Sequence, residues 1–345
     1  MYFYELAGAA LKLVNDMLEL KPGETFIITA DTESDMDVVN ATASAAFAIG
    51  AKPMVITYPA PPNVGKADEH ILPGDALVGA LLRADVWVEF NNKWMIFSTP
   101  FEQATAENQN LRYLNLTGMN ADMMTRLIGR VDQKSLSAFM HAVVDMIRDT
   151  GRMRITTPAG TDLEFEMNPE NTLFCDDGKA NVPGVHMLIG QICFIPKLSS
   201  INGRLVFEGS ICPVPGVIHE PVDMKIEKGV ICEIKGGATA EAFKEWLNSF
   251  NDPAMFRLAQ GCLGLNPGGM ISGNVLDGER VWGSTEWGIG HLSAYESPKE
   301  HFDGPSHTDG LCLRSSIWLD DRQIMDLGKF VEPRLKAMAL DLGME

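Results

Sequence analysis

The sequence predicts an α/β protein: an N-terminal parallel α/β layer followed by an α+β domain with a mostly antiparallel sheet. Residues 1–150 alternate continuous apolar runs of strand length with helical stretches, which is typical of parallel β-α-β units. Residues 151–345 consist mainly of short alternating runs between tight turns, which is typical of antiparallel strands. A chain of 345 residues is long enough for these two domains.

The first domain begins with an amphipathic helix and then alternates strands with helices. The strands are apolar throughout, so both faces of their sheet should be buried. The first strand is followed by residues 30–34, which lack a Gly-x-Gly-x-x-Gly pattern, and a dinucleotide site is therefore not indicated. The expected elements are helices at 6–20 and 35–49 and strands at 25–29, 53–58, 85–90 and 112–115.

In the second domain, from about Gly151, Gly-containing turns separate the predicted strands. Residues 227–229 join two alternating runs as an antiparallel hairpin. One clear helix interrupts the strands, and the sequence Asn251-Asp252-Pro253 ends it. The expected elements are strands at 152–157, 162–167, 203–207, 222–226 and 230–234 and a helix at 240–250.

The composition favours a cytoplasmic protein without nucleic-acid or membrane partners. The 46 acidic and 28 basic side chains give a formal charge of −18, which repels phosphate backbones and anionic lipids. The six cysteines form no Cys-x-x-Cys pair or dense framework, which fits reduced thiols. Neither a leader peptide nor an apolar run of membrane-spanning length is apparent.

The pair His307 and Asp309 is the first candidate for chemistry. In an extended segment, side chains at i and i+2 leave the same face, so an imidazole and a carboxylate would converge as two ligands of one metal ion. The glycines and proline around the pair predict a turn that leads into a strand at about 311–319. On spacing alone, an incidental surface pair or a hydrogen-bonded turn histidine is the alternative.

Glu286 is the second candidate, because it lies among apolar and glycine residues in a segment that should be buried. A buried carboxylate is costly unless it is paired or bound to metal, so we expect a ligand or catalytic role. Glu279, beside Arg280, is expected to form a solvated ion pair. His291 is a candidate catalytic residue from the same tract, although spacing alone does not separate a pocket position from the surface.

Several tracts together resemble the 2,5-dihydroxypyridine 5,6-dioxygenase family, iron enzymes of nicotinate breakdown, which is similar to the aminopeptidase T group of metallopeptidases. The peptidase motifs Gly-Thr-x-His-x-x-x-Gly and Ser-x-x-His-x-Asp look like residues 283–290 and 305–309 here. The tracts that carry the likeness to the dioxygenase are 226–230 with Gly236-Gly237, the helix up to 250–253, the turn at 264–267 and the pair His307 and Asp309.

The resemblance implies a facial triad in which an upstream histidine and the His-x-Asp pair hold Fe(II); zinc or cobalt is the alternative metal. His307 and Asp309 match this triad, but Gln260 occupies the position of the upstream histidine. Glu286 replaces the peptidase motif histidine and is a candidate third ligand. A second peptidase glutamate corresponds to Gln191, so a two-metal peptidase site is not expected.

The resemblance also implies a small aromatic substrate and dioxygen as reactants. Where the dioxygenase has a loop histidine after its third strand, residues 94–103 offer aromatic and apolar side chains. Phe97 in this loop is expected either to stack on a flat ring or to pack in the core. Together with Phe97, the expected substrate-binding residues are Gln191, Trp287 and Tyr295.

The leading hypothesis is therefore a mononuclear metal enzyme, with Fe(II) as the expected metal, that acts as a ring-cleaving dioxygenase on a hydroxylated pyridine or a similar N-heteroaromatic. An aminopeptidase T-like amide hydrolase, with Glu279 or Glu286 as proton acceptor, and a metal-free, non-catalytic relative are the alternatives. A homo-oligomer is expected from the size of the chain.

Overall fold

The computed structural model describes residues 3–345, which form two compact units. Of the described residues, unit 1 comprises 3–133 and 178–189, and unit 2 comprises 134–177 and 190–345. This division differs from a single boundary near residue 150, because the segment 178–189 returns to the first unit. Within the described residues, no helix is both long enough and apolar enough to span a bilayer.

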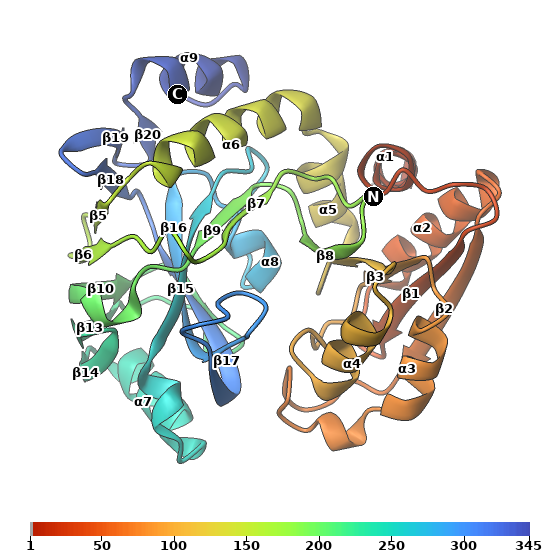
Figure 1. Cartoon of the computed structure of the whole chain (residues 1–345), viewed down its shortest axis with the longest axis horizontal. Helices are drawn as coiled ribbons and strands as arrows, with labels where there is room; N and C mark the ends of the chain where they lie inside the picture. Colours follow the sequence, from red (N-terminus) through yellow and green to blue (C-terminus); the bar gives the residue numbers. More distant parts are fainter. Residues whose placement is uncertain (1–2) are drawn as a thin grey trace. The chain divides into compact units, whose positions relative to one another are not determined.

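Unit 1 contains a parallel sheet with the strand order β2-β1-β3-β4-β8 (Figure 1). Strands β1 and β3 are buried along almost their whole length, as the apolar runs predicted. Asp35 caps the second helix by accepting a hydrogen bond from the Asp37 amide, which explains where that helix begins. The strands are β1 (Thr25–Asp31), β2 (Lys52–Tyr58), β3 (Val86–Glu89), β4 (Arg112–Asn115) and β8 (Gly184–Met187).

The helices of unit 1 agree with the expected β-α-β pattern. The opening helix is split, since an α-helix is continued by a π-helical turn at Leu13–Met17. The others are separated by short loops, and π-helical and 3₁₀ turns lie at Thr125–Gly129 and Glu69–Ile71. The helices are α1 (Phe3–Lys12), α2 (Met36–Ala48), α3 (Gly74–Leu81), α4 (Thr99–Glu107) and α5 (Ala121–Met124).

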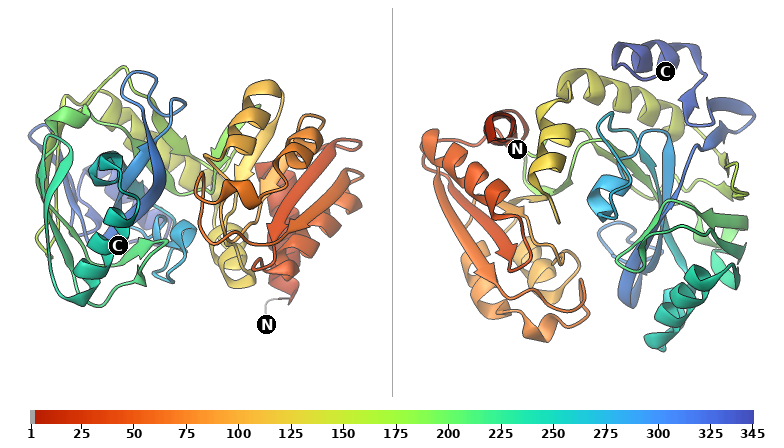
Figure 2. Two further views of the ribbon diagram at one scale, coloured as in Figure 1. Left: turned by 90° about the horizontal axis from the view of Figure 1, so that it is seen from below. Right: turned by 180° about the vertical axis from the view of Figure 1, so that it is seen from behind.

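Unit 2 contains two antiparallel sheets (Figures 1 and 2). The eight-stranded sheet has the order β14-β13-β10-β6-β5-β18-β19-β20. The predicted hairpin is confirmed, because β13 and β14 pair in antiparallel fashion. Its strands are β5 (Arg152–Thr156), β6 (Asp162–Glu166), β10 (Asn202–Phe207), β13 (Val222–Glu227), β14 (Val230–Lys235), β18 (Ser316–Leu319), β19 (Arg322–Asp326) and β20 (Lys329–Phe330).

The seven-stranded sheet of unit 2 has the order β12-β11-β17-β16-β15-β9-β7. Its three central strands, β15, β16 and β17, are almost entirely buried. Its strands are β7 (Leu173–Asp176), β9 (Gln191–Phe194), β11 (Ser210–Cys212), β12 (Gly216–Val217), β15 (Leu258–Gly264), β16 (Ser284–Leu292) and β17 (Phe302–Cys312). The helices of unit 2 are α6 (Gln133–Arg148), α7 (Ala238–Ser249), α8 (Val275–Gly278) and α9 (Pro333–Asp341), with 3₁₀ turns at Leu198–Ser200 and Pro253–Phe256.

Aromatic side chains fill the space between the two sheets of unit 2. Phe165 on β6 stacks on Phe194 of β9, with ring centroids 5.8 Å apart, and meets the Trp287 ring of β16 edge-on at 5.4 Å. Because neighbouring residues of a strand point to opposite faces, Glu286 and Gly288 leave β16 on the side away from this core. That other face of the seven-stranded sheet carries the polar residues of interest.

Candidate metal centre on the seven-stranded sheet

His307 and Asp309 lie in the middle of β17, and the predicted turn at this place is wrong. Asp309 is opposite Gly288 of β16 and His307 is opposite Gly290, in an unbroken antiparallel ladder. The side chains of His307 and Asp309 nevertheless converge, as expected from their spacing. They share one face of β17, and 3.0 Å separates His307 Nε2 from Asp309 Oδ1. Glycine opposite Asp309 leaves room for the Gln260 side chain, whose amide occupies the place of a Cβ at Gly288.

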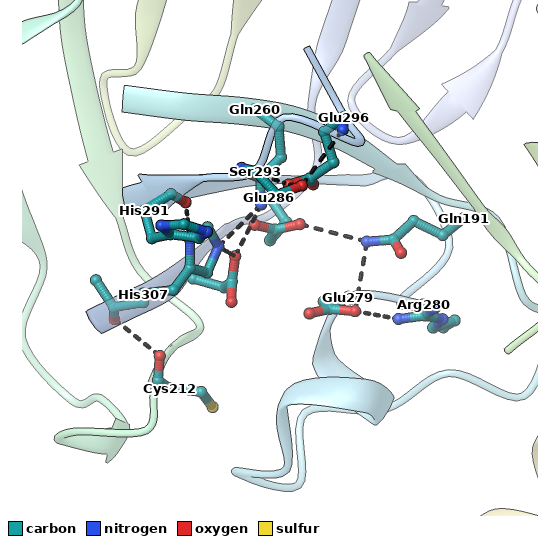
Figure 3. Close-up of polar contacts among 12 residues, drawn as sticks. Gln191, Cys212, Gln260, Glu279, Arg280, Glu286, His291, Ser293, Glu296 and His307 are labelled. Carbon is teal, nitrogen blue, oxygen red and sulfur yellow. Dashed lines mark hydrogen bonds and ion pairs between the residues drawn. The ribbon is translucent and has the colours of Figure 1, made fainter. Parts of the chain in front are cut away.

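Three carboxylates gather on this face (Figure 3). Single oxygens of Glu279, Glu286 and Asp309 all lie within 4.8 Å of one another, a spacing at which they could share one metal ion. Glu286 is 2 % exposed and Asp309 is 8 % exposed. Burial, followed by the charge of Asp309 and a hydrogen bond with it, raises the pKa of Glu286 well above its ordinary value.

Arg280 partly offsets the charge of this cluster. Its guanidinium group is fully buried and forms an ion pair with Glu279, contrary to the expectation of a solvated pair. Burial nevertheless raises the pKa of Glu279 to about 7, against the lowering effect of Arg280. The Gln191 amide also reaches the cluster, donating to Glu279 Oε2 at 3.4 Å and to Glu286 Oε2 at 3.3 Å.

The backbone sets the orientation of the His307 ring. Its Nδ1 lies 2.8 Å from the carbonyl oxygen of His291, an acceptor, so Nδ1 carries a proton. In the neutral ring, Nε2 then keeps its lone pair and faces the carboxylates, as in histidines that bind metal. Burial is the largest single effect and lowers the pKa of His307, but the charge of Asp309, the hydrogen bond with it, the charge of Glu296 and the His291 carbonyl together raise this pKa to about 9.

Gln260 lies directly beside the His-Asp pair. Its Nε2 is 3.1 Å from His307 Nε2 and 3.2 Å from Asp309 Oδ1. Its Oε1 is buried and, within residues 3–345, receives no hydrogen bond. A half-turn of the amide would therefore bring a carbonyl oxygen to the imidazole, where it could bind a cation.

This donor set fits a divalent cation. One imidazole nitrogen and three carboxylates are ligands that iron, manganese and zinc accept. Buried like charges repel one another, and a cation compensates that repulsion directly. Glu286 Oε1 is buried without a donor anywhere in the described part of the chain, which is the condition of an oxygen that coordinates a metal.

The structure groups some of the predicted site residues and separates others. Gln191, Gln260, Glu286, His307 and Asp309 come together as described above. Trp287 does not, because its ring is 0 % exposed and packs between the sheets on the opposite face of β16.

Three other predicted residues have different surroundings. The His291 side chain is buried and accepts a hydrogen bond from the Gly304 amide at 3.3 Å, while its carbonyl group orients His307. Tyr295 is 55 % exposed and lies 5.6 Å from the Phe174 ring. Phe97 belongs to unit 1, where it has a left-handed backbone with φ 69° and contacts the Phe101 ring.

Sequence reasoning named Glu279 as a possible proton acceptor but expected it to be solvated, and it missed Glu296. Glu279 was expected on the surface, although the full burial of Arg280 next to it excludes a solvated pair. Glu296 was not considered, because it lies in the loop between β16 and β17. Alternation along the strands would have flagged neither residue, since neither is part of a strand.

Comparison with known proteins supports the resemblance found in the sequence. The profile of the family described as NicX, 2,5-dihydroxypyridine 5,6-dioxygenase, matches residues 9–332. The 2,5-dihydroxypyridine 5,6-dioxygenase of Pseudomonas putida KT2440 is 25% identical over 322 residues, covering 87% of this chain and 89% of that protein.

Two solved structures share the fold. The structure of the 2,5-dihydroxypyridine dioxygenase from Pseudomonas putida KT2440 matches with a TM-score of 0.79 and 21% identity, covering 96% of this chain and 98% of the other. Wild-type AmpT from Thermus thermophilus matches with a TM-score of 0.70 and 15% identity, covering 96% and 100%. The mixed α/β fold expected from the sequence is therefore confirmed.

Proposed function

The chain belongs to the NicX family of 2,5-dihydroxypyridine 5,6-dioxygenases, and from this premise we propose that it is a mononuclear Fe(II) enzyme that opens the ring of a hydroxylated pyridine. The family makes it a ring-cleaving dioxygenase. The metal and the particular substrate are our proposal, and so are the roles of the site residues.

We assign the metal ligands from the geometry of the polar face. His307 Nε2, Asp309 and Glu286 would hold the ion as one imidazole and two carboxylates, with Glu279 and Gln260 at its border. Fe(II) would supply open positions at which a hydroxylated ring and dioxygen meet. The chain itself orients His307 through the carbonyl oxygen of His291 and excludes water by burying the cluster.

One observation carries this proposal. Glu286 Oε1 is buried, and it has no hydrogen-bond partner among residues 3–345. A stable core rarely leaves such an oxygen without a partner, so the site is best explained as built for a cation. The same face also brings His307 Nε2 within 3.0 Å of Asp309 Oδ1.

A hydrolase related in fold to AmpT is the second candidate, and the state of Glu279 favours it. Burial brings the pKa of its carboxyl group to about 7, which suits a group that takes a proton from water. In that case zinc or cobalt would support release of amino acids from peptide amides without any oxygen consumption.

The test is anaerobic reconstitution with Fe(II), followed by oxygen uptake in the presence of dihydroxypyridines. Uptake that requires iron, and that disappears in a His307→Ala, Asp309→Ala double variant, is the expected result. His219→Ala is the matched control, since His219 is exposed and lies outside the cluster. Peptide amide hydrolysis without oxygen uptake would favour the second candidate and contradict the first.

A further inference from the structure

The loop that joins β16 to β17 forms a fixed part of the polar face. It connects the strand of Glu286 to the strand of His307 and Asp309. Hydrogen bonds hold the end of the loop that precedes β17. The buried Ser297 donates to Asn171 Oδ1 at 2.9 Å, and Asn171 Nδ2 in turn donates to Glu300 Oε2 at 3.1 Å. These contacts lie within unit 2, so the loop has a defined position over its own sheet.

Glu296 in this loop has one oxygen held and the other available. Glu296 Oε2 accepts hydrogen bonds from the Ser293 amide at 3.1 Å and from the Ser293 hydroxyl at 2.7 Å. Two donors on one carboxylate oxygen fix the rotation of the group. Figure 3 shows Glu296 and Ser293 in the same close-up as Gln260 and Glu286.

The carboxyl group of Glu296 interacts electrostatically with two residues of the cluster, His307 and Asp309. Burial raises the pKa of its carboxyl group; Ser293 and the charge of His307 lower it, and Asp309 raises it. The charge of Glu296 also raises the pKa of Cys193 on β9 and the pKa of Tyr295 in the same loop. Glu296 is not among the carboxylates whose oxygens cluster within 4.8 Å. It therefore lies near the candidate metal position without belonging to its ligands.

We propose that Glu296 is a catalytic residue that accepts the proton of a substrate ring hydroxyl. The proposal rests on the proposed function, because it takes a hydroxylated pyridine as the substrate. In this step the ring O–H bond breaks, its electron pair stays on the ring oxygen, and the proton forms a new O–H bond at Glu296 Oε1. The ring oxygen becomes an anion, which is the form that donates most strongly to a cation.

Glu296 suits this role better than the clustered carboxylates do. Glu279 is paired with Arg280, and Glu286 and Asp309 interact with each other and are the carboxylates that we assign to the metal. When a cation is bound, the oxygens of these carboxylates would therefore be occupied by the cation or by Arg280, and they would not accept a proton from the substrate. Ser293 restrains only Oε2 of Glu296, which leaves Oε1 for a hydroxyl group that enters from outside the cluster.

The test measures the ionisation of bound substrate without turnover. Iron-loaded protein is mixed anaerobically with 2,5-dihydroxypyridine, and the absorption spectrum reports whether the bound ring is neutral or anionic. We expect the anion in the wild type and the neutral ring in Glu296→Gln, with equal iron content. In air, turnover of this variant should fall about 100-fold, which is typical for the loss of a general base.

Two further variants separate proton transfer from a structural role. Glu300→Gln removes a charge of the same loop but keeps a side-chain oxygen that can accept from Asn171, so the spectrum and turnover should be unchanged. Ser293→Ala keeps the Glu296 carboxylate and the amide donor but removes the hydroxyl donor, so Glu296 is held less firmly, and turnover should fall about 3- to 10-fold while the fold and iron content are kept. Methyl ethers of the substrate have no proton to give, and their binding should be the same in the wild type and in Glu296→Gln.

Several outcomes would overturn the proposal. An anionic ring bound to Glu296→Gln, with turnover within about 3-fold of the wild type, excludes Glu296 as the proton acceptor. If Glu296→Gln does not fold or loses iron, Ser293→Ala becomes the deciding variant. Wild-type turnover of Ser293→Ala would then exclude Glu296 as the proton acceptor. If the wild type itself binds iron but no dihydroxypyridine, the proposed function fails, and this proposal falls with it.

Discussion

At the scale of single residues, burial of charge distinguishes the polar positions that matter. Glu286 was expected to be buried from its apolar neighbours, and it is. The shared face of His307 and Asp309 also followed from their spacing. The burial of the ion pair between Glu279 and Arg280 did not follow from the sequence, because adjacent opposite charges are usually solvated. Only the fold shows that helix α8 and the turn after it bury this pair.

Unit 1 has a buried acid of its own, Glu89 at the end of β3. It accepts hydrogen bonds from the Tyr113 hydroxyl and the Met95 amide, but burial dominates and raises the pKa of Glu89 to about 7. The folded state therefore binds the proton more tightly than the unfolded chain. Protonated Glu89 therefore stabilises the folded state. This stabilisation is complete below pH 4.5 and is lost as the pH rises through 7.

We predict that Glu89→Gln removes this pH dependence. Between about pH 5 and pH 8 the free energy of unfolding of the wild type should fall by up to about 3 kcal/mol relative to the variant. Urea unfolding, with hydrogen exchange in β1, β3 and β4 as the local readout, measures the difference. Asp321→Asn, at a fully exposed side chain, is the control. A constant difference between wild type and Glu89→Gln across this range would contradict the prediction.

At the scale of elements, most strands and helices were predictable, and β17 was not. Glycines and a proline in residues 304–310 indicated a turn, yet this segment is a central strand. The physical reason is close packing, because a methyl group at Gly310 would overlap the Phe207 ring of the facing sheet. Glycine here serves the approach of two sheets and not a reversal of the chain.

Gly288 has the corresponding role on the polar face, where a methyl group would overlap the Gln260 amide. We predict that Gly288→Ala displaces Gln260 from His307 and Asp309 and weakens Fe(II) binding about 10-fold. The free energy of unfolding should change by at most about 1–3 kcal/mol, because a side-chain end can move aside. Competition with a fluorescent chelator measures the affinity.

Gly79→Ala is the matched control for this substitution. Gly79 lies in helix α3, and an added methyl group meets no atom within 4 Å. The control should keep the wild-type iron affinity and gain about 0.5–1 kcal/mol of stability from the better helix former. Equal iron affinity of Gly288→Ala and the wild type would show that the position of Gln260 does not affect the site.

At the scale of the whole molecule, the sequence predicted two domains, but local patterns did not show how the chain crosses between them. Helix α6 ends at Arg148 and was grouped with the first domain. Its Phe139 instead stacks on Trp282 at 5.1 Å and meets Phe330 at 4.9 Å, both in unit 2. Strand β8 returns to pair with β4, a contact between segments about 70 residues apart that no local pattern encodes.

We predict different behaviour for two fragments of the first unit. Residues 1–150 lack β8 and carry α6 without its partners, so this fragment should aggregate. Residues 1–133 joined to 178–189 should stay in solution and unfold cooperatively. A short Gly-Ser linker suffices, because the Gln133 side chain donates to the Gly178 carbonyl at 2.7 Å. Sedimentation and circular dichroism distinguish the two, and a stable 1–150 fragment would contradict this division.

The central claim is that one cation binds between His307, Asp309 and a third oxygen ligand on the seven-stranded sheet. Anomalous diffraction at the iron edge from crystals loaded with Fe(II) tests it most directly. We predict one peak at about 2.0–2.2 Å from His307 Nε2 and from oxygens of Asp309 and Glu286. A peak away from His307 and Asp309, or none in crystals of protein that consumes oxygen with iron, would contradict it.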